Sequence, residues 1–183
     1  MAVWLSETLP QLQEIRPRVT IHKPCNRIRN EEIKIQGILD KNVYQNGDTV
    51  KVDITIELHP ARKIKSVTAV AVQSVDVAMF SSGFFKNEVG AEMLKDLGVC
   101  SSFSHQFLLK PQYSPGRHWV AVKDWGPSVT SIPDENQPLS ASVILKDRSL
   151  FVIRVLYYVQ VQVRLSKNRK DLELKLPFVM LAA

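Results

Sequence analysis

The sequence predicts an all-β protein, an antiparallel immunoglobulin-like β-sandwich with at most one short helix. Apolar and polar residues alternate over 50–58 and again over 155–165, with the period of two that marks a half-buried strand. A third segment, 66–80, is rich in small and β-branched residues, which is typical of a strand buried on both faces. Around eight such segments without an internal repeat favour two packed antiparallel sheets.

The predicted strands follow one another from residue 33 onward and are separated by polar turns. Asn-Gly-Asp at 46–48 is a turn signal, because glycine and asparagine accept the positive φ of tight turns. A basic turn is expected at 59–65, and the polar stretch 166–170 predicts a final hairpin. Only 90–97 has the pattern of a short amphipathic helix. The predicted strands lie near 33–39, 49–58, 64–80, 102–109, 117–123, 140–146, 150–166 and 171–181.

The first part of the chain differs from the rest. Residues 1–31 are interpreted as an N-terminal arm or inter-domain segment, and residues 32–183 as one β-sandwich domain. Within the arm, 19–21 is a candidate strand. Pro17 and Pro24 suit an edge strand or a linker, because proline cannot donate to a strand ladder.

Composition and charge describe an ordinary globular chain with a moderate preference for acidic partners. The 183 residues include 45% hydrophobic and 23% charged residues, and the net charge is +6. A positive charge favours phosphopeptides, inositol phosphates or anionic lipid, although a solvated basic surface is an equal alternative. Nucleic acid is not expected, because the aromatic residues are not interleaved with a basic stripe.

The cysteines and the apolar runs indicate a cytoplasmic protein. Cys25 and Cys100 form neither a CxxC pair nor a zinc spacing, so they are expected to be free thiols in a reducing compartment. The opening residues lack the basic and apolar regions of a secretory signal. No apolar run approaches the ~20 residues of a membrane-spanning helix.

The residues that carry most enzyme chemistry do not form a recognisable pattern. The four histidines are isolated, and neither a nucleophile elbow nor a glycine-rich phosphate loop is present. We therefore expect a non-catalytic binding module without a cofactor or metal. A small enzyme that uses Asp124 and Asp134 in a cleft is the alternative in a different class.

A series of short blocks occurs in a fixed order over about 33–181, and together they resemble the C-terminal domain of the arrestins. The resemblance implies an antiparallel sandwich. It also implies an adaptor that desensitises or traffics phosphorylated G-protein-coupled receptors and is peripheral at membranes when engaged. The blocks are Leu39-Asp40-Lys41, Tyr44, Gly47, Val50, Val52, Gln73, Asp76, Phe80, Ala141-Ser142, 158–165 and 174–180.

A long irregular segment before residue 139 matches the lariat loop of the arrestins. The resemblance makes Asp124 the first loop aspartate and places Asp134 and Glu135 near the second, where Asn136 occupies the aspartate position. In the family these carboxylates belong to a buried polar cluster between two domains; the alternative is a solvated acidic loop. Trp125 is a candidate partner anchor, because tryptophan is enriched at interface hot spots.

Four basic residues predict a weak phosphate or inositol-phosphate site. The resemblance matches Lys86 with a lysine of the family's inositol-phosphate site, but Gln160 and Gln162 stand where that site has lysines. Phosphate binding depends on charge-assisted contacts, so weak binding is expected, and a solvated basic turn is the alternative. The four residues are Arg62, Lys63, Lys65 and Lys86.

The tip of the final hairpin carries Lys167, Arg169 and Lys170. The resemblance makes this tip a membrane-edge loop, and each cation contributes about 1 kcal/mol near anionic lipid. An ordinary basic hairpin is the alternative.

The rival to a receptor regulator is a self-standing arrestin-like scaffold or a retromer-type trafficking module. Such a module binds a protein partner through a sheet edge and does not need phosphate. Partner capture without phosphate separates this alternative from receptor regulation.

Overall fold

Seven strands make up the part of the chain that the computed structural model describes, residues 16–26, 31–78, 82–112, 139–142, 152–166 and 171–181. No helix occurs in these ranges, so none there could cross a bilayer, and the all-β prediction is confirmed. The strands are β1 (Arg18–Asn26), β2 (Glu31–Leu39), β3 (Val43–Gln45), β4 (Val50–Ala78), β5 (Ser82–Leu109), β6 (Val152–Leu165) and β7 (Leu172–Leu181).

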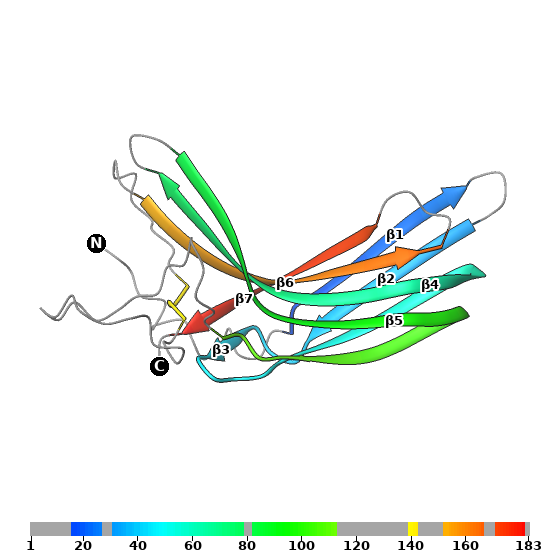
Figure 1. The fold of residues 1–183 in the computed structure, drawn as a ribbon, viewed down its shortest axis with the longest axis horizontal. Helices are drawn as coiled ribbons and strands as arrows, with labels where there is room; N and C mark the ends of the chain where they lie inside the picture. Colours follow the sequence, from blue (N-terminus) through cyan, green and yellow to red (C-terminus); the bar gives the residue numbers. More distant parts are fainter. Residues whose placement is uncertain are drawn as a thin grey trace, which may run out of the picture.

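Two long strands, β4 and β5, pair with each other and connect the two halves of the fold. The first half of β4 pairs with β2, and its second half pairs with β6. The strand order is β1-β2-β4-β6-β7-β3, with β5 alongside β4. In Figure 1 the cyan and green ribbons of β4 and β5 run through both halves of the curled sheet.

The basic segment 59–65 is not a turn, and that expectation was wrong. β4 continues through it as one strand, with register shifts against β5 between Glu57 and Arg62 and between Ile64 and Ser66. Because Pro60 lacks an N–H and the inserted residues leave the ladder, the strand bends without reversing. This bend is where β4 changes its partner from β2 to β6.

The expected helix at 90–97 was also wrong. These residues belong to β5, where Ala91 pairs with Val70 and Met93 pairs with Thr68. A short apolar pattern fits both the helix period of 3.6 residues and the strand period of two. Here the long antiparallel pairing with β4 supplies the backbone hydrogen bonds, so the segment is a strand. Met93 is consequently 52% exposed on the outer face.

The core lies between the two halves of the sheet. The alternation predicted for the last two strands is confirmed, because the odd residues of β6 from Val155 onward and the even residues of β7 are buried. The two strands form the expected hairpin. Gly37 of β2 packs tightly against β7, where an added Cβ would lie 2.5 Å from a methyl carbon of Leu174.

The edges of the sheet contain two strands that the sequence did not fully predict. Residues 18–26 form β1, an edge strand antiparallel to β2. Of the two alternatives for this segment, an edge strand or a linker, the structure therefore shows the edge strand. The domain boundary at residue 31 stays a prediction. β3 was missed, and it pairs in parallel with β7. The candidate strand 117–123 lies outside the described residues, as does 143–146. Residues 139–142 are described and are not a strand.

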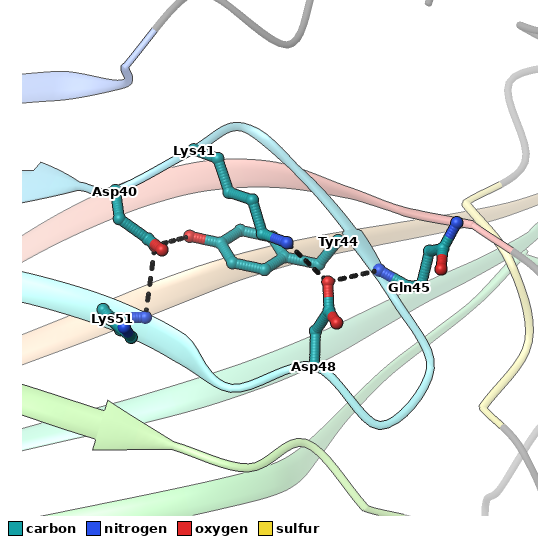
Figure 2. A network of polar contacts seen from close by, with 6 residues as sticks. All are labelled: Asp40, Lys41, Tyr44, Gln45, Asp48 and Lys51. Carbon is teal, nitrogen blue, oxygen red and sulfur yellow. Dashed lines mark hydrogen bonds and ion pairs between the residues drawn. The ribbon is translucent and has the colours of Figure 1, made fainter.

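A polar corner joins β2 to β4 through β3 (Figure 2). The Tyr44 hydroxyl donates to the Asp40 carboxylate at 2.5 Å, and the Lys51 backbone N–H donates to the same carboxylate oxygen at 3.3 Å. The Tyr44 ring is fully buried and meets Phe178 edge to face at 5.2 Å. Burial and the neighbouring Asp40 carboxylate raise the pKa of Tyr44, so the hydroxyl remains a donor.

The same corner is closed by an ion pair around the turn. The Lys41 ammonium donates to Asp48 at 2.5 Å, and the Gln45 backbone N–H donates to the same carboxylate at 3.1 Å, as Figure 2 shows. Gly47 has a φ of 91°, in the left-handed region that favours glycine. The residues near position 40 that carry the family resemblance, Asp40, Lys41, Tyr44 and Gly47, therefore form this corner and its turn.

The Lys41 ion pair predicts a pH-dependent contribution to stability. The Lys41 hydrogen bond holds the pKa of Asp48 below its ordinary value of 3.8. A depressed folded-state pKa contributes stability above the ordinary value, and this contribution is lost as the pH falls through the folded-state pKa. Lys41→Met should therefore lower the melting temperature at neutral pH but not near pH 2. Since both side chains are about one-third exposed, we expect well under ~1 kcal/mol.

Melting curves of the wild type and Lys41→Met at several pH values test this expectation. Lys51→Met is the matched control, because the Lys51 side chain is exposed and only its backbone N–H joins the corner. A difference between wild type and Lys41→Met that is the same at every pH would contradict the assignment.

Candidate functional site

A groove of about 670 Å³ lies on the face of β4, β5 and β6 that points away from the core. Its floor includes Thr68 and Val70 of β4 and Gln160 and Gln162 of β6. These positions alternate with buried residues such as Ala69, so strand periodicity places them on the outer face. Register brings the four side chains together, because Thr68 pairs with Gln162 and Val70 pairs with Gln160.

The charges around the groove are mixed. Arg164 and Asp171 form a two-pronged ion pair at one wall, with Nη2 and Nε of Arg164 2.9 and 3.2 Å from the carboxylate oxygens. This pair raises the pKa of Arg164 and lowers that of Asp171, so both remain charged. Lys95, paired with Ser66, lies toward one end, and Glu88 lies toward the other.

The groove has the chemistry of a binding surface for an extended polypeptide. The amides of Gln160 and Gln162 each offer donors and an acceptor, which match the alternating groups of a peptide backbone. Val70 on β4 and the exposed side chain of Met93 on β5 add apolar surface beside these amides. Within the described ranges, no three histidine, cysteine or carboxylate residues are grouped to hold a metal ion.

The structure separates the four basic residues that predicted a phosphate site. Three of them occupy the bend of β4, whereas Lys86 lies on β5 opposite Ser74. Lys65 and Ser74 are nine residues apart on β4, which corresponds to roughly 30 Å along an extended strand. Lys86 instead lies 5.4 Å above the ring centroid of Phe84. The bend and Lys86 are therefore two separate basic places, and phosphate binding at either stays a prediction. The three residues of the bend are Arg62, Lys63 and Lys65.

The remaining candidates lie outside the described residues, and their roles also stay predictions. They are Asp124, Trp125, Asp134, Glu135, Lys167, Arg169 and Lys170.

Sequence reasoning missed the role of a buried polar network around Gln73, which is completely inaccessible. Its amide nitrogen donates to the Tyr157 hydroxyl at 2.7 Å and to the Ser140 hydroxyl at 3.2 Å. Its amide oxygen accepts from the Asn87 side chain at 3.0 Å. Tyr157 in turn donates to the backbone oxygen of Ser140, and burial raises its pKa. The sequence signal that could have indicated this network is Gln73 itself, a single amide within the long apolar segment 66–80.

The network fixes residues 139–142 against the sheet, and a second set of hydrogen bonds assists it. The Asn46 amide donates to the Leu139 carbonyl at 2.8 Å and accepts from the Leu139 N–H at 3.0 Å. Ser142 and Met180 also exchange two hydrogen bonds, at 2.7 and 2.9 Å. Side chains and β7 thus supply the pairing that a regular neighbouring strand would give.

Comparison with known proteins agrees with this architecture. Residues 29–182 match the family described as "Arrestin (or S-antigen), C-terminal domain". An "Arrestin homolog" of Heliothis virescens is 26% identical over 171 residues, which cover 87% of this chain and 44% of that protein. "Phosrestin-2" of Calliphora vicina is 25% identical over 179 residues, covering 90% and 48%. "Beta-arrestin-2" of Rattus norvegicus is 25% identical over 154 residues, covering 81% and 36%.

The chain spans less than half of the length of these relatives. The matched region contains six of the seven described strands, all except β1. Because residues 29–182 are most of the chain, the match establishes the family and confirms the resemblance seen in the sequence. The chain belongs to the arrestin family and contains its C-terminal domain.

Proposed function

We propose that this domain is a non-catalytic binding module of an arrestin-like protein that regulates phosphorylated G-protein-coupled receptors, by desensitisation or trafficking. It works in the cytoplasm and at the membrane surface when a receptor is engaged. The observation that carries the proposal is the match of residues 29–182 to the arrestin C-terminal domain. Relatives named beta-arrestin and phosrestin support it.

The groove on the outer face of β4, β5 and β6 is the surface that we assign to the receptor. Its amides and its apolar surface fit an extended segment of a partner, and an exposed concave surface of this size suits binding without chemistry. Met93 is the side chain best placed for a test, since it is exposed and its replacement spares the core.

Capture of receptors in nanodiscs tests the proposal. We expect the chain to bind an agonist-activated, phosphorylated receptor more tightly than the inactive receptor or an empty nanodisc. Met93→Asp should weaken this binding at least about tenfold, because it places a charge on an apolar contact. Val99→Asp is the matched control, on the same strand but outside the groove and 71% exposed. Equal binding to all nanodiscs would refute the proposal.

A second candidate function is a self-standing scaffold or retromer-type module whose partner needs no phosphate. The observation that favours it is the pair of neutral amides, Gln160 and Gln162, among the residues that line the groove. The same nanodisc assay separates the two functions. Binding that does not change on receptor dephosphorylation, but is lost in Met93→Asp, would support the second one.

The groove also predicts how the protein responds to inositol hexakisphosphate. We expect weak, salt-sensitive binding, because Gln160 and Gln162 provide no charge and Lys86 lies beyond the groove. Changing both glutamines to lysine should tighten binding at least about tenfold at low salt, through two charge-assisted contacts. Titration calorimetry measures the affinity.

The control for this titration is a double variant, Gln45→Lys with Gln112→Lys, which adds the same charge at two exposed positions away from the groove. Equal tightening by the two double variants would show a general effect of net charge. Tight binding by the wild type would show that other cations form the site.

A further inference from the structure

The second half of β5 has an unusual composition for a strand at a sheet edge. Residues 97–109 contain no Asp, Glu, Lys, Arg or Pro, although this strand pairs only with β4 among the strands that the structure describes. Edge strands normally carry such residues because they discourage pairing with another chain. Val99 and Leu108 are also 71% and 53% exposed. An uncharged, partly apolar edge of this kind favours strand addition.

Glu92, in the first half of β5, contacts this edge. Its Oε2 accepts a hydrogen bond from the Leu108 backbone N–H at 2.9 Å. Its Oε1 lies 3.8 Å from Nε2 of His105, a buried nitrogen without a hydrogen-bond partner in the described residues. Glu92 pairs with the buried Ala69, so its side chain starts on the inner face of the sheet. The carboxylate thus occupies the position that a backbone carbonyl of an added strand would take.

The chain that follows β5 reinforces this contact. The Gln112 N–H donates to the Val89 carbonyl at 2.7 Å, which occupies a backbone acceptor of the first half of β5. Gly90 lets the backbone of Lys110 lie close to β5, because a Cβ at position 90 would lie 2.9 Å from the Lys110 carbonyl oxygen. The two halves of β5 are therefore connected by a side chain and by backbone, across the side of the fold opposite to β4.

We propose that Glu92 is an edge latch, a carboxylate that blocks strand addition at 97–109, and that the strand it excludes is the same edge of a second copy of this chain. Two identical edges meet in antiparallel orientation about a two-fold axis. Charged edges would repel each other in that arrangement, whereas 97–109 has no formal charge to do so. A charged partner peptide would find no complementary charge on this edge.

Hydrogen exchange of the wild-type protein gives the first test. The Leu108 amide should exchange slowly in the monomer, because the Glu92 carboxylate occupies it. Exchange as fast as that of an exposed amide in a loop would overturn the proposal without any variant.

Variants at two glutamates of β5 give the second test. Glu92→Ala should speed exchange of the Leu108 amide at least about tenfold at low concentration. It should also form dimers at high concentration in sedimentation runs, with renewed protection of the amides over 97–109. Glu92→Gln keeps an acceptor oxygen and should remain monomeric. Glu88→Ala, on the same strand and exposed, should match the wild type in Leu108 amide exchange and in sedimentation.

Two outcomes of the variant test would overturn the edge latch. One is a folded Glu92→Ala protein that stays monomeric at every concentration. The other is dimerisation of Glu88→Ala to the same extent as Glu92→Ala, which would show that loss of negative charge drives association irrespective of the edge.

Discussion

Replacing Gln73 with leucine is expected to lower the free energy of unfolding by about 3–5 kcal/mol, because several buried polar groups each lose a hydrogen bond together. The Asn87 amide, the Ser140 hydroxyl and the Tyr157 hydroxyl all bond to Gln73 inside the sheet. Each buried group left without its partner costs about 1–3 kcal/mol. For a chain of this size the melting temperature should fall by roughly 10 °C.

Urea unfolding followed by circular dichroism measures this loss. Gln45→Leu is the matched control, because it makes the same chemical change at an exposed position and should alter stability by less than ~0.5 kcal/mol. If Gln73→Leu were as stable as the control, water would have to replace the amide, and the network would not be what fixes residues 139–142.

Gly37→Val should cost about 3 kcal/mol or more, because the new side chain enters a tight contact between β2 and β7 in the core. Even a single Cβ at Gly37 would lie 2.5 Å from Leu174, 2.8 Å from Leu176 and 3.2 Å from Ile54. All three side chains are buried, so they have little room to move away. Valine adds two further methyl groups at the same place.

Thermal melting of Gly37→Val and of Gln36→Val tests this expectation. Gln36 is the preceding residue of β2 and points to the opposite face, so its valine variant places the same side chain on the strand without entering the core. Equal stability of the two variants would show that β2 and β7 move apart at Gly37 without a loss of folding free energy.

The strands whose faces follow from their own sequence were predictable. β6 and β7 alternate so regularly that their buried faces and their hairpin could be assigned from residue types alone. β4 was predicted as two strands, because a proline with basic neighbours has the composition of a turn. Only the long pairing with β5 shows that the segment is a bend, and this pairing depends on residues far away in sequence.

The candidate site was predictable in part. The family resemblance directed attention to Gln160 and Gln162, which do line a groove. The same reasoning grouped Lys86 with the basic bend, because sequence likeness carries no distances. Glu92 was hidden inside a pattern that resembled a helix, and its contact with Leu108 forms only after β5 bends back.

The continuity of β4 and β5 through both halves also determines how the chain folds. Ala78 pairs with Ser82 close by in sequence, so this hairpin closes a short loop and we expect it to form early. Joining β6 to β4 brings residue 165 to residue 64 and closes a long loop, so we expect this step to be late and to limit the folding rate. Because each half shares its central strands with the other, we expect that neither half melts alone. We therefore expect the domain to unfold as a single cooperative unit.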